Sequence, residues 1–151
     1  QHFVGTKAID HVLVSEADLK QAWWAVTTGN NGAYIRSLFD VEGIRFETIH
    51  DTTWLADDLG LFIQASHTPG VIGLILKTEH HGTILTTSDA IYPADSYRQA
   101  LPPGGTINAT TDEFYDNLER IKAMEKNYNA TLLFGHDIDQ ILDWAGQGVI
   151  D

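Results

Sequence analysis

The sequence predicts an α/β (α+β) fold, in which a mostly antiparallel or mixed sheet packs against helices. Three observations support this fold class. Short β-rich runs, separated by turn residues, fill the middle of the chain between residues 44 and 87. Runs with a helical spacing of apolar residues come before and after them. The chain has 151 residues, of which 43% are apolar, and this is enough for one domain with a sizeable core.

The first predicted elements are a strand and a helix. Residues 8–14 are rich in β-branched and apolar side chains and predict the strand. Ser15 then occupies the position of a helix N-cap, and Asp18 follows three residues later, as in a capping box. We expect this helix to run to about residue 26 and to end at the Gly- and Asn-rich loop over 28–32.

Four β-rich runs come next, and turn residues separate them. The runs cover residues 44–49, 61–65, 71–77 and 83–87. The separators at 57–60 and 79–82 each end in glycine and are typical of hairpin turns. Because such short connections reverse the chain direction, we expect an antiparallel meander.

The last third of the chain predicts a long loop and then three regular elements. Residues 92–108 hold three of the four prolines and a Gly-Gly pair, so we expect a surface loop of the kind that covers a site. The regular elements are a helix from 110 or 111, a buried strand at 131–134, and a helix from about 138 to 146.

Composition excludes some classes of function. The net charge is −12 and only nine residues are basic, which argues against nucleic acid as a partner. No apolar run approaches the roughly 20 residues of a membrane helix, so we expect no spanning segment. There is no cysteine to indicate a compartment. Two N-x-T sequons, at Asn108 and Asn129, slightly favour secretion, and a cytoplasmic location stays open.

Three metal-capable side chains each follow an apolar strand run. His67 comes after the run at 61–65, Asp89 after the run at 83–87, and His136 after the run at 131–134. Residues at the ends of neighbouring strands can converge on one edge of a sheet, where sites commonly form. Imidazole and carboxylate are ligands that zinc takes in catalytic sites, and a carboxylate can bridge two ions.

These segments resemble the metallo-β-lactamase superfamily, and most of all the N-acyl homoserine lactonases. The turn His67-Thr68-Pro69-Gly70 is similar to the family's H-[ST]-P-G turn. Residues 87–90 resemble the segment with the bridging aspartate, and residues 134–137 resemble the family's F-G-H-D segment. The resemblance extends over residues 46–143. It implies one half of an αββα sandwich, a sheet with helices on one face.

The resemblance also implies a chemistry. His67, Asp89 and His136 would be zinc ligands, and Asp89 would bridge two ions. Tyr92 matches the tyrosine that polarises the lactone carbonyl, so Tyr92 and Asp89 are the implied catalytic residues of a metal-dependent hydrolase. Zinc-bound hydroxide would attack a lactone or ester carbonyl. The H-x-H-x-D-H cluster that supplies the first ligands does not occur in this sequence. We therefore expect the chain to be incomplete, or inactive without an N-terminal half.

A half sandwich would leave one apolar sheet face uncovered. Several hundred Å² of such surface costs upward of about 10 kcal/mol at about 25 cal/mol/Å². We expect residues 1–151 to form a single truncated domain that pairs with a second copy or with an N-terminal fragment, with a small lactone or ester as substrate. Two alternatives stay open. One is a degenerate, non-catalytic secreted binding or toxic protein that uses the apolar face, and the other is a module that binds one metal ion.

Overall fold

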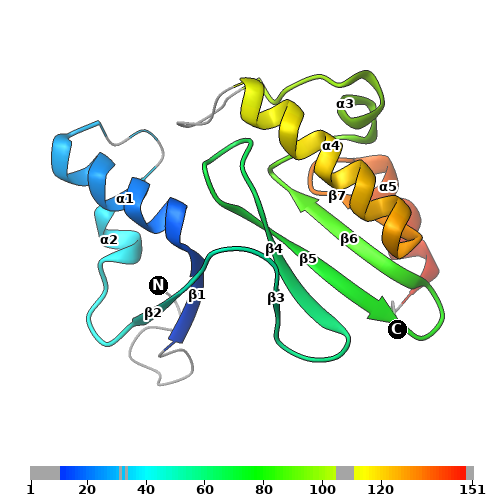
Figure 1. Cartoon of the computed structure of the whole chain (residues 1–151), viewed down its shortest axis with the longest axis horizontal. Coiled ribbons are helices and arrows are strands. Elements are labelled where there is room, and N and C mark those ends of the chain that lie inside the picture. The colour runs from blue at the N-terminus through cyan, green and yellow to red at the C-terminus, as the bar shows by residue number, and fades with distance from the viewer. Residues whose placement is uncertain (1–10, 31, 33, 105–110, 149–151) are drawn as a thin grey trace. The chain divides into compact units, whose positions relative to one another are not determined.

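The computed structural model describes residues 11–30, 32, 34–104 and 111–148. It divides into two compact units, Gln1–His50 and Asp51–Asp151, each with its own sheet (Figure 1). The single domain predicted over the whole chain is not tested by this division and stays a prediction.

The first unit holds a two-stranded sheet and two helices. Its elements are β1 (His11–Ser15), α1 (Glu16–Thr28), α2 (Arg36–Phe39) and β2 (Arg45–Ile49). The predicted cap of α1 is confirmed, because the Ser15 hydroxyl accepts a hydrogen bond from the Asp18 N–H at 3.3 Å. The helix ends at Gly29, whose φ of 76° is readily reached by glycine. The predicted place of β2 in the antiparallel meander is wrong, because β2 pairs in parallel with β1.

The second unit is built on a five-stranded mixed sheet. Its strands are β3 (Thr53–Trp54), β4 (Leu59–Gln64), β5 (Val71–Thr78), β6 (Gly82–Ser88) and β7 (Ala130–Phe134), and they lie in that order. Strands β4, β5 and β6 form the predicted antiparallel meander, and β3, which was not predicted, pairs with β4 at its edge. Strand β7 returns and pairs in parallel with β6 (Figure 1). This arrangement confirms the mixed sheet.

Three helices accompany this sheet: α3 (Ala94–Gln99), α4 (Thr111–Tyr128) and α5 (Ile138–Gln147). The last two agree with the sequence prediction. The first corrects it, because α3 lies within the segment 92–108 that we expected to be an extended loop. Pro93 stands at the N-cap of α3 with extended backbone, so this proline comes before the helix and does not interrupt it. Residues 105–108 of the expected loop lie outside the described residues.

The main core lies between one face of the sheet and α4. Large apolar side chains from both are almost fully buried, and together they form one cluster: Phe62, Ile75, Leu85, Ile91, Phe114, Leu118, Ile121, Leu132 and Phe134. Each such side chain contributes about 1.5–3 kcal/mol when it leaves water. The α4 contacts therefore fix the strands whose ends carry the predicted site.

The opposite face of the sheet is also apolar. Side chains that alternate with the core residues along the strands are only half-buried: Leu59, Ile63, Ile72, Leu74, Leu76 and Leu133. Leu61 and Ile84, which alternate in the same way, are buried. We call this set of six half-buried residues the second face.

The structure describes the second of the two sequons. The second sequon begins at Asn129, an exposed residue between α4 and β7, and the first, at Asn108, lies outside the described residues. Secretion stays a prediction. Among the helices that the structure describes, none is both long and apolar enough to cross a bilayer.

Candidate functional site

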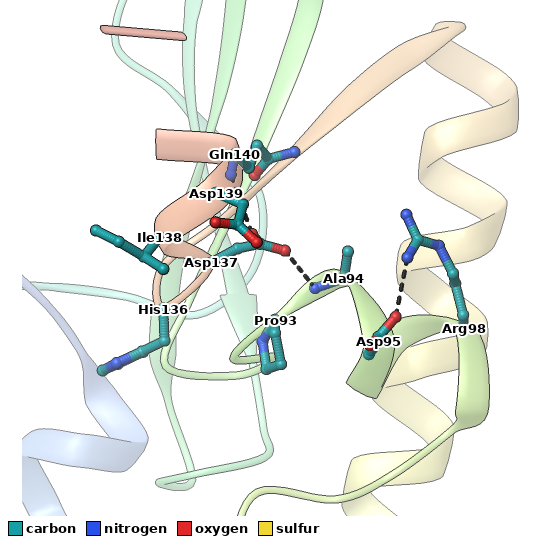
Figure 2. A pocket seen from close by; sticks show the side chains of 9 residues that line it. All are labelled: Pro93, Ala94, Asp95, Arg98, His136, Asp137, Ile138, Asp139 and Gln140. Carbon is teal, nitrogen blue, oxygen red and sulfur yellow. Dashed lines mark hydrogen bonds and ion pairs between the residues drawn. The ribbon is translucent and has the colours of Figure 1, made fainter. Parts of the chain in front are cut away.

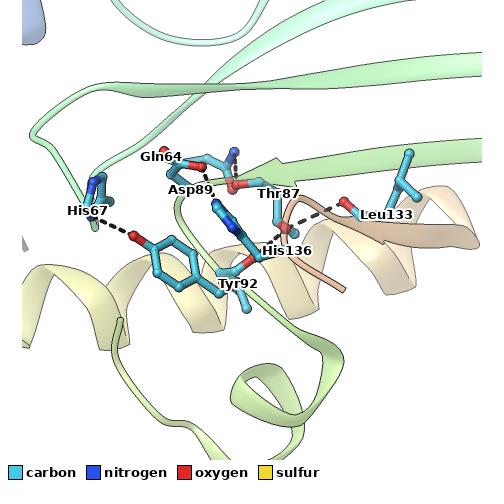
Figure 3. Close-up of polar contacts among 8 residues, drawn as sticks. Gln64, His67, Thr87, Asp89, Tyr92, Leu133 and His136 are labelled. Carbon is cyan, nitrogen blue, oxygen red and sulfur yellow. Dashed lines mark hydrogen bonds and ion pairs between the residues drawn. The ribbon is translucent and has the colours of Figure 1, made fainter. Parts of the chain in front are cut away.

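The four residues singled out in the sequence lie on turns that follow β4, β6 and β7. His67 follows β4, Asp89 and Tyr92 follow β6, and His136 follows β7. The backbone N–H of His136 donates to the carbonyl of Tyr92 at 3.2 Å, so the turns after β6 and β7 are joined directly. Figure 3 shows the four side chains converging from these turns.

Tyr92 lies between the two histidines. Its hydroxyl is 3.3 Å from Nδ1 of His67, and its ring centroid is 4.3 Å from that of His136. Nε2 of His136 lies 2.9 Å from Oδ1 of Asp89, which makes a hydrogen-bonded pair (Figure 3). The four side chains therefore form a continuous polar cluster, here called the Tyr92 cluster.

This arrangement fits part of a metal site and not a whole one. The structure brings Asp89 and His136 into direct contact, whereas His67 joins them through Tyr92. Within residues 11–30, 32, 34–104 and 111–148, no three His, Cys, Asp or Glu side chains are placed to hold one ion. The donor types are those that zinc takes. The role of the three residues as ligands stays a prediction.

The surroundings of Tyr92 keep its hydroxyl protonated. Burial raises the pKa of Tyr92, and the negative charge of Asp89 raises it further. At neutral pH the hydroxyl is therefore a hydrogen-bond donor. A donor of this kind, on a half-buried side chain, can stabilise negative charge that develops on a carbonyl oxygen.

The glycine in the segment 134–137 has a packing reason. A Cβ built on Gly135 would lie 2.7 Å from the carbonyl oxygen of Ser88 and 3.0 Å from its carbonyl carbon. Ser88 itself has a φ of 48° and sits at a shift in the register between β6 and β7. Only glycine allows the two turns that carry Asp89 and His136 to approach this closely.

Asp137 and Gln140 hold the surrounding helices in place. The Asp137 carboxylate accepts hydrogen bonds from the Ala94 N–H at 2.9 Å and from the Gln140 N–H at 3.1 Å. These two bonds lower the pKa of Asp137. Asp137 is the N-cap of α5. The side-chain amide of Gln140 binds the backbone of β7. Its oxygen accepts from the Phe134 N–H and its nitrogen donates to the Leu132 carbonyl, both at 2.8 Å.

Gln140 was not among the residues predicted from the sequence. A signal for it was available, because Asp137 and Gln140 are spaced as in a capping box.

A cavity of about 510 Å³ opens beside His136, between α3 and the start of α5 (Figure 2). Its lining is mostly polar, and Arg98 in it pairs with Asp95 at 2.9 Å.

Comparisons with known proteins find lactonases that are similar to part of this chain. An N-acyl homoserine lactonase of Bacillus thuringiensis is 30% identical over 80 residues, which cover 53% of this chain and 31% of the relative. A solved N-acyl homoserine lactone hydrolase, with the product N-hexanoyl-L-homoserine bound at its catalytic metal centre, superposes with a TM-score of 0.77 at 20% identity. That match covers 92% of this chain and 52% of the other.

A solved structure from Thermotoga maritima, named as a candidate metallo-β-lactamase, matches with a TM-score of 0.54 at 19% identity over 84% of this chain and 56% of that one. The chain carries part of a metallo-β-lactamase fold. No protein-family model matches it. The chain spans about a third to just over half of the proteins it matches. The predicted similarity to lactonases of the metallo-β-lactamase fold is thus confirmed over part of their length.

Proposed function

We propose that this chain carries part of the active site of a hydrolase that opens lactones or related esters. The observation that carries the proposal is the Tyr92 cluster, which gathers His67, Asp89, Tyr92 and His136 on adjacent turns. The fold match to a lactone hydrolase with product at its metal centre supports the assignment of the cluster to that chemistry.

In this proposal Tyr92 acts on the carbonyl group of the substrate. Its hydroxyl donates a hydrogen bond to the carbonyl oxygen and stabilises the negative charge that develops there. A tyrosine hydroxyl ionises only at about pH 10, so it keeps its proton and can donate across the neutral range. Oδ1 of Asp89 lies 2.9 Å from Nε2 of His136, and this contact holds the imidazole beside the Tyr92 ring.

The chain supplies only some of the donors of the proposed metal centre. Zinc is the group implied by the lactonase resemblance, and it would supply a Lewis acid and a bound hydroxide. His67, Asp89 and His136 are the residues of this chain proposed to face it. Because the described residues place no three donors around one ion, the remaining donors are proposed to come from a separate segment, such as an N-terminal fragment.

The second face supports such completion. Its half-buried leucines and isoleucines give the sheet an apolar surface opposite α4. Soluble proteins rarely leave contiguous apolar surface in contact with water. We expect a second apolar layer, from another copy of the chain or from an N-terminal fragment, to cover these residues.

One observation favours a second candidate, a non-catalytic binding protein. Helix α5 has no buried residue, and it exposes Ile138, Ile141 and Leu142 by 62%, 40% and 63%. These three positions share one side of the helix. A degenerate relative could use this surface, or the second face, to contact a partner or a membrane.

The two candidates differ in metal content and in turnover. Zinc per chain is measured by mass spectrometry on protein purified from its own cells without chelators, and lactone ring opening is followed on the same preparation. About two ions per site, with turnover that falls about 10²-fold in Tyr92→Phe, support the hydrolase. Tyr128→Phe, at an exposed tyrosine at the end of α4, is the matched control and leaves turnover unchanged. A preparation with neither zinc nor turnover would favour the binding protein. A preparation with one ion and no turnover would favour a module that binds one metal ion.

A further inference from the structure

The segment that carries Asp89 leaves the regular sheet. Between Thr86 and Ser88 the register of β6 against β7 shifts, and Ser88 takes a φ of 48°. A bulge of this kind removes carbonyl groups from the ladder, and they need other donors when they are buried. Residues 86–91, here called the Asp89 loop, therefore depend on groups outside the ladder for their shape.

Two buried side chains, Gln64 at the end of β4 and Ser66 just after it, donate to carbonyls of this loop, and the Ala90 N–H also donates to the Thr87 carbonyl at 3.0 Å. Nε2 of Gln64 donates to the carbonyls of Thr86 at 3.4 Å and Thr87 at 3.2 Å. The hydroxyl of Ser66 donates to the carbonyl of Ala90 at 2.8 Å. Gln64 and Ser66 are both fully buried. Figure 3 shows the Gln64 amide directed at the Thr87 backbone, close to Asp89.

The neighbouring strand is adapted to this amide. A Cβ at Gly73 would lie 2.4 Å from Nε2 of Gln64 and 2.5 Å from the carbonyl oxygen of Thr86, so a side chain there would displace the contact. The amide nitrogen is hydrogen-bonded but the amide oxygen is not. Oε1 of Gln64 is buried and has no hydrogen-bond partner in the described part of the chain. An unpaired buried oxygen lowers stability, so packing alone does not account for a glutamine at this position.

We infer that Gln64 is a positioning residue for Asp89, with Ser66 as its second support. The two side chains tie the strand that leads to His67 to the loop that carries Asp89, and so fix where the Asp89 carboxylate meets His136. The catalytic value of that position rests on the proposed function. The positioning itself does not, and it is tested without any turnover.

The test compares Gln64→Met, which keeps the length of the side chain and removes both donors, with Ile121→Val on α4. Ile121 is fully buried in the same core, and it is part of α4 and not of the Asp89 loop. Hydrogen exchange of the Ala90 N–H, which donates to Thr87 O at 3.0 Å, reports opening of the loop. We expect exchange at Ala90 to rise about tenfold or more in Gln64→Met relative to the exchange of core amides. In Ile121→Val this ratio stays unchanged.

A crystal structure of Gln64→Met reports the carboxylate itself, and we expect Asp89 to have lost its hydrogen bond to His136. If Gln64→Met does not fold, Ser66→Ala is measured in its place. We expect this smaller change also to raise the exchange rate of the Ala90 N–H. Unchanged Ala90 exchange together with an intact Asp89–His136 pair would overturn the inference and leave the proposed function standing. If wild-type protein hydrolyses no lactone but Ala90 exchanges faster in Gln64→Met, the proposed function is overturned and the inference about Gln64 stands.

Discussion

At the scale of single residues, the site depends on close approach between two turns. Gly135 lets the turn after β7 contact the backbone of Ser88, and this contact brings His136 to Asp89 at 2.9 Å. Tyr92 then packs against the imidazole with a centroid separation of 4.3 Å. The geometry of the Tyr92 cluster thus depends on the absence of a Cβ at Gly135 as well as on the side chains of the cluster.

Replacing Gly135 by alanine tests this dependence. The new Cβ would meet backbone atoms that cannot move aside like a flexible side chain, so we expect Gly135→Ala to lower the free energy of unfolding by about 1–3 kcal/mol. Urea unfolding measures the change. Gly146→Ala is the matched control, because nothing lies within 4 Å of its added Cβ and it sits inside α5. That control is expected to gain up to about 1 kcal/mol, and equal effects of the two changes would contradict the account.

The sequence was informative about which residues meet and less so about how they meet. The ends of apolar runs indicated His67, Asp89 and His136, and the resemblance to lactonases indicated Tyr92. The role of Gln64 was missed, although a polar residue directly after the apolar residues 61–63 was a visible signal. The hydrogen-bonded pairing of Asp89 with His136 could not be predicted, because it depends on the register shift after Thr86.

At the scale of elements, Asp137 ties the starts of α3 and α5 together. Asp137→Ala removes the acceptor of the Ala94 and Gln140 N–H groups, and we expect a loss of about 1–2 kcal/mol in the free energy of unfolding. Asp137→Asn keeps a capping oxygen and should lose less. Because the pKa of Asp137 is lowered in the folded state, its contribution is present above the unfolded-state pKa and is lost as pH falls through the folded-state pKa. The difference between wild type and Asp137→Ala should shrink in acid, and a difference that grew there would contradict this.

Tyr97 links α3 to α4 through a hydrogen bond from its hydroxyl to the Glu125 carboxylate. Burial raises the pKa of Tyr97, and this bond raises it further. The folded state therefore holds the proton at a pH where the unfolded chain has lost it, so stability present below about pH 10 is lost as pH rises further. We expect the thermal unfolding temperature of wild type to fall more steeply than that of Tyr97→Phe as the pH is raised from neutral to 11. Parallel pH profiles would show that Tyr97 is not responsible.

Most elements of the second unit could be predicted, and the exceptions have physical causes. Alternating burial along β5 and the amphipathic spacing of α4 are local patterns that a sequence carries directly. The six-residue helix α3 was missed because three prolines and a Gly-Gly pair dominate its surroundings. The parallel pairing of β2 with β1 is a tertiary choice that no local pattern specifies.

At the scale of the whole molecule, the second face predicts association. If a second copy covers it, light scattering after size exclusion should give a mass above the 16.7 kDa of one chain, falling on dilution. Leu74→Glu, on the second face, should shift the mass toward the monomer. Ala56→Glu, at an exposed position in the turn after β3, adds the same charge and should not. A sharp monomer at all concentrations would leave a separate N-terminal fragment as the proposed cover.

The most direct test of the central claim is the rate of lactone ring opening by the protein from its own cells, compared with its Asp89→Asn variant. Asp143→Asn, an exposed carboxylate on α5, serves as the control. If the Tyr92 cluster belongs to a hydrolase, wild type and control open an N-acyl homoserine lactone at equal rates, and Asp89→Asn is slower by about 10²-fold or more. Ring opening that is indifferent to Asp89, or absent in wild-type protein that carries its full complement of zinc, would contradict the account.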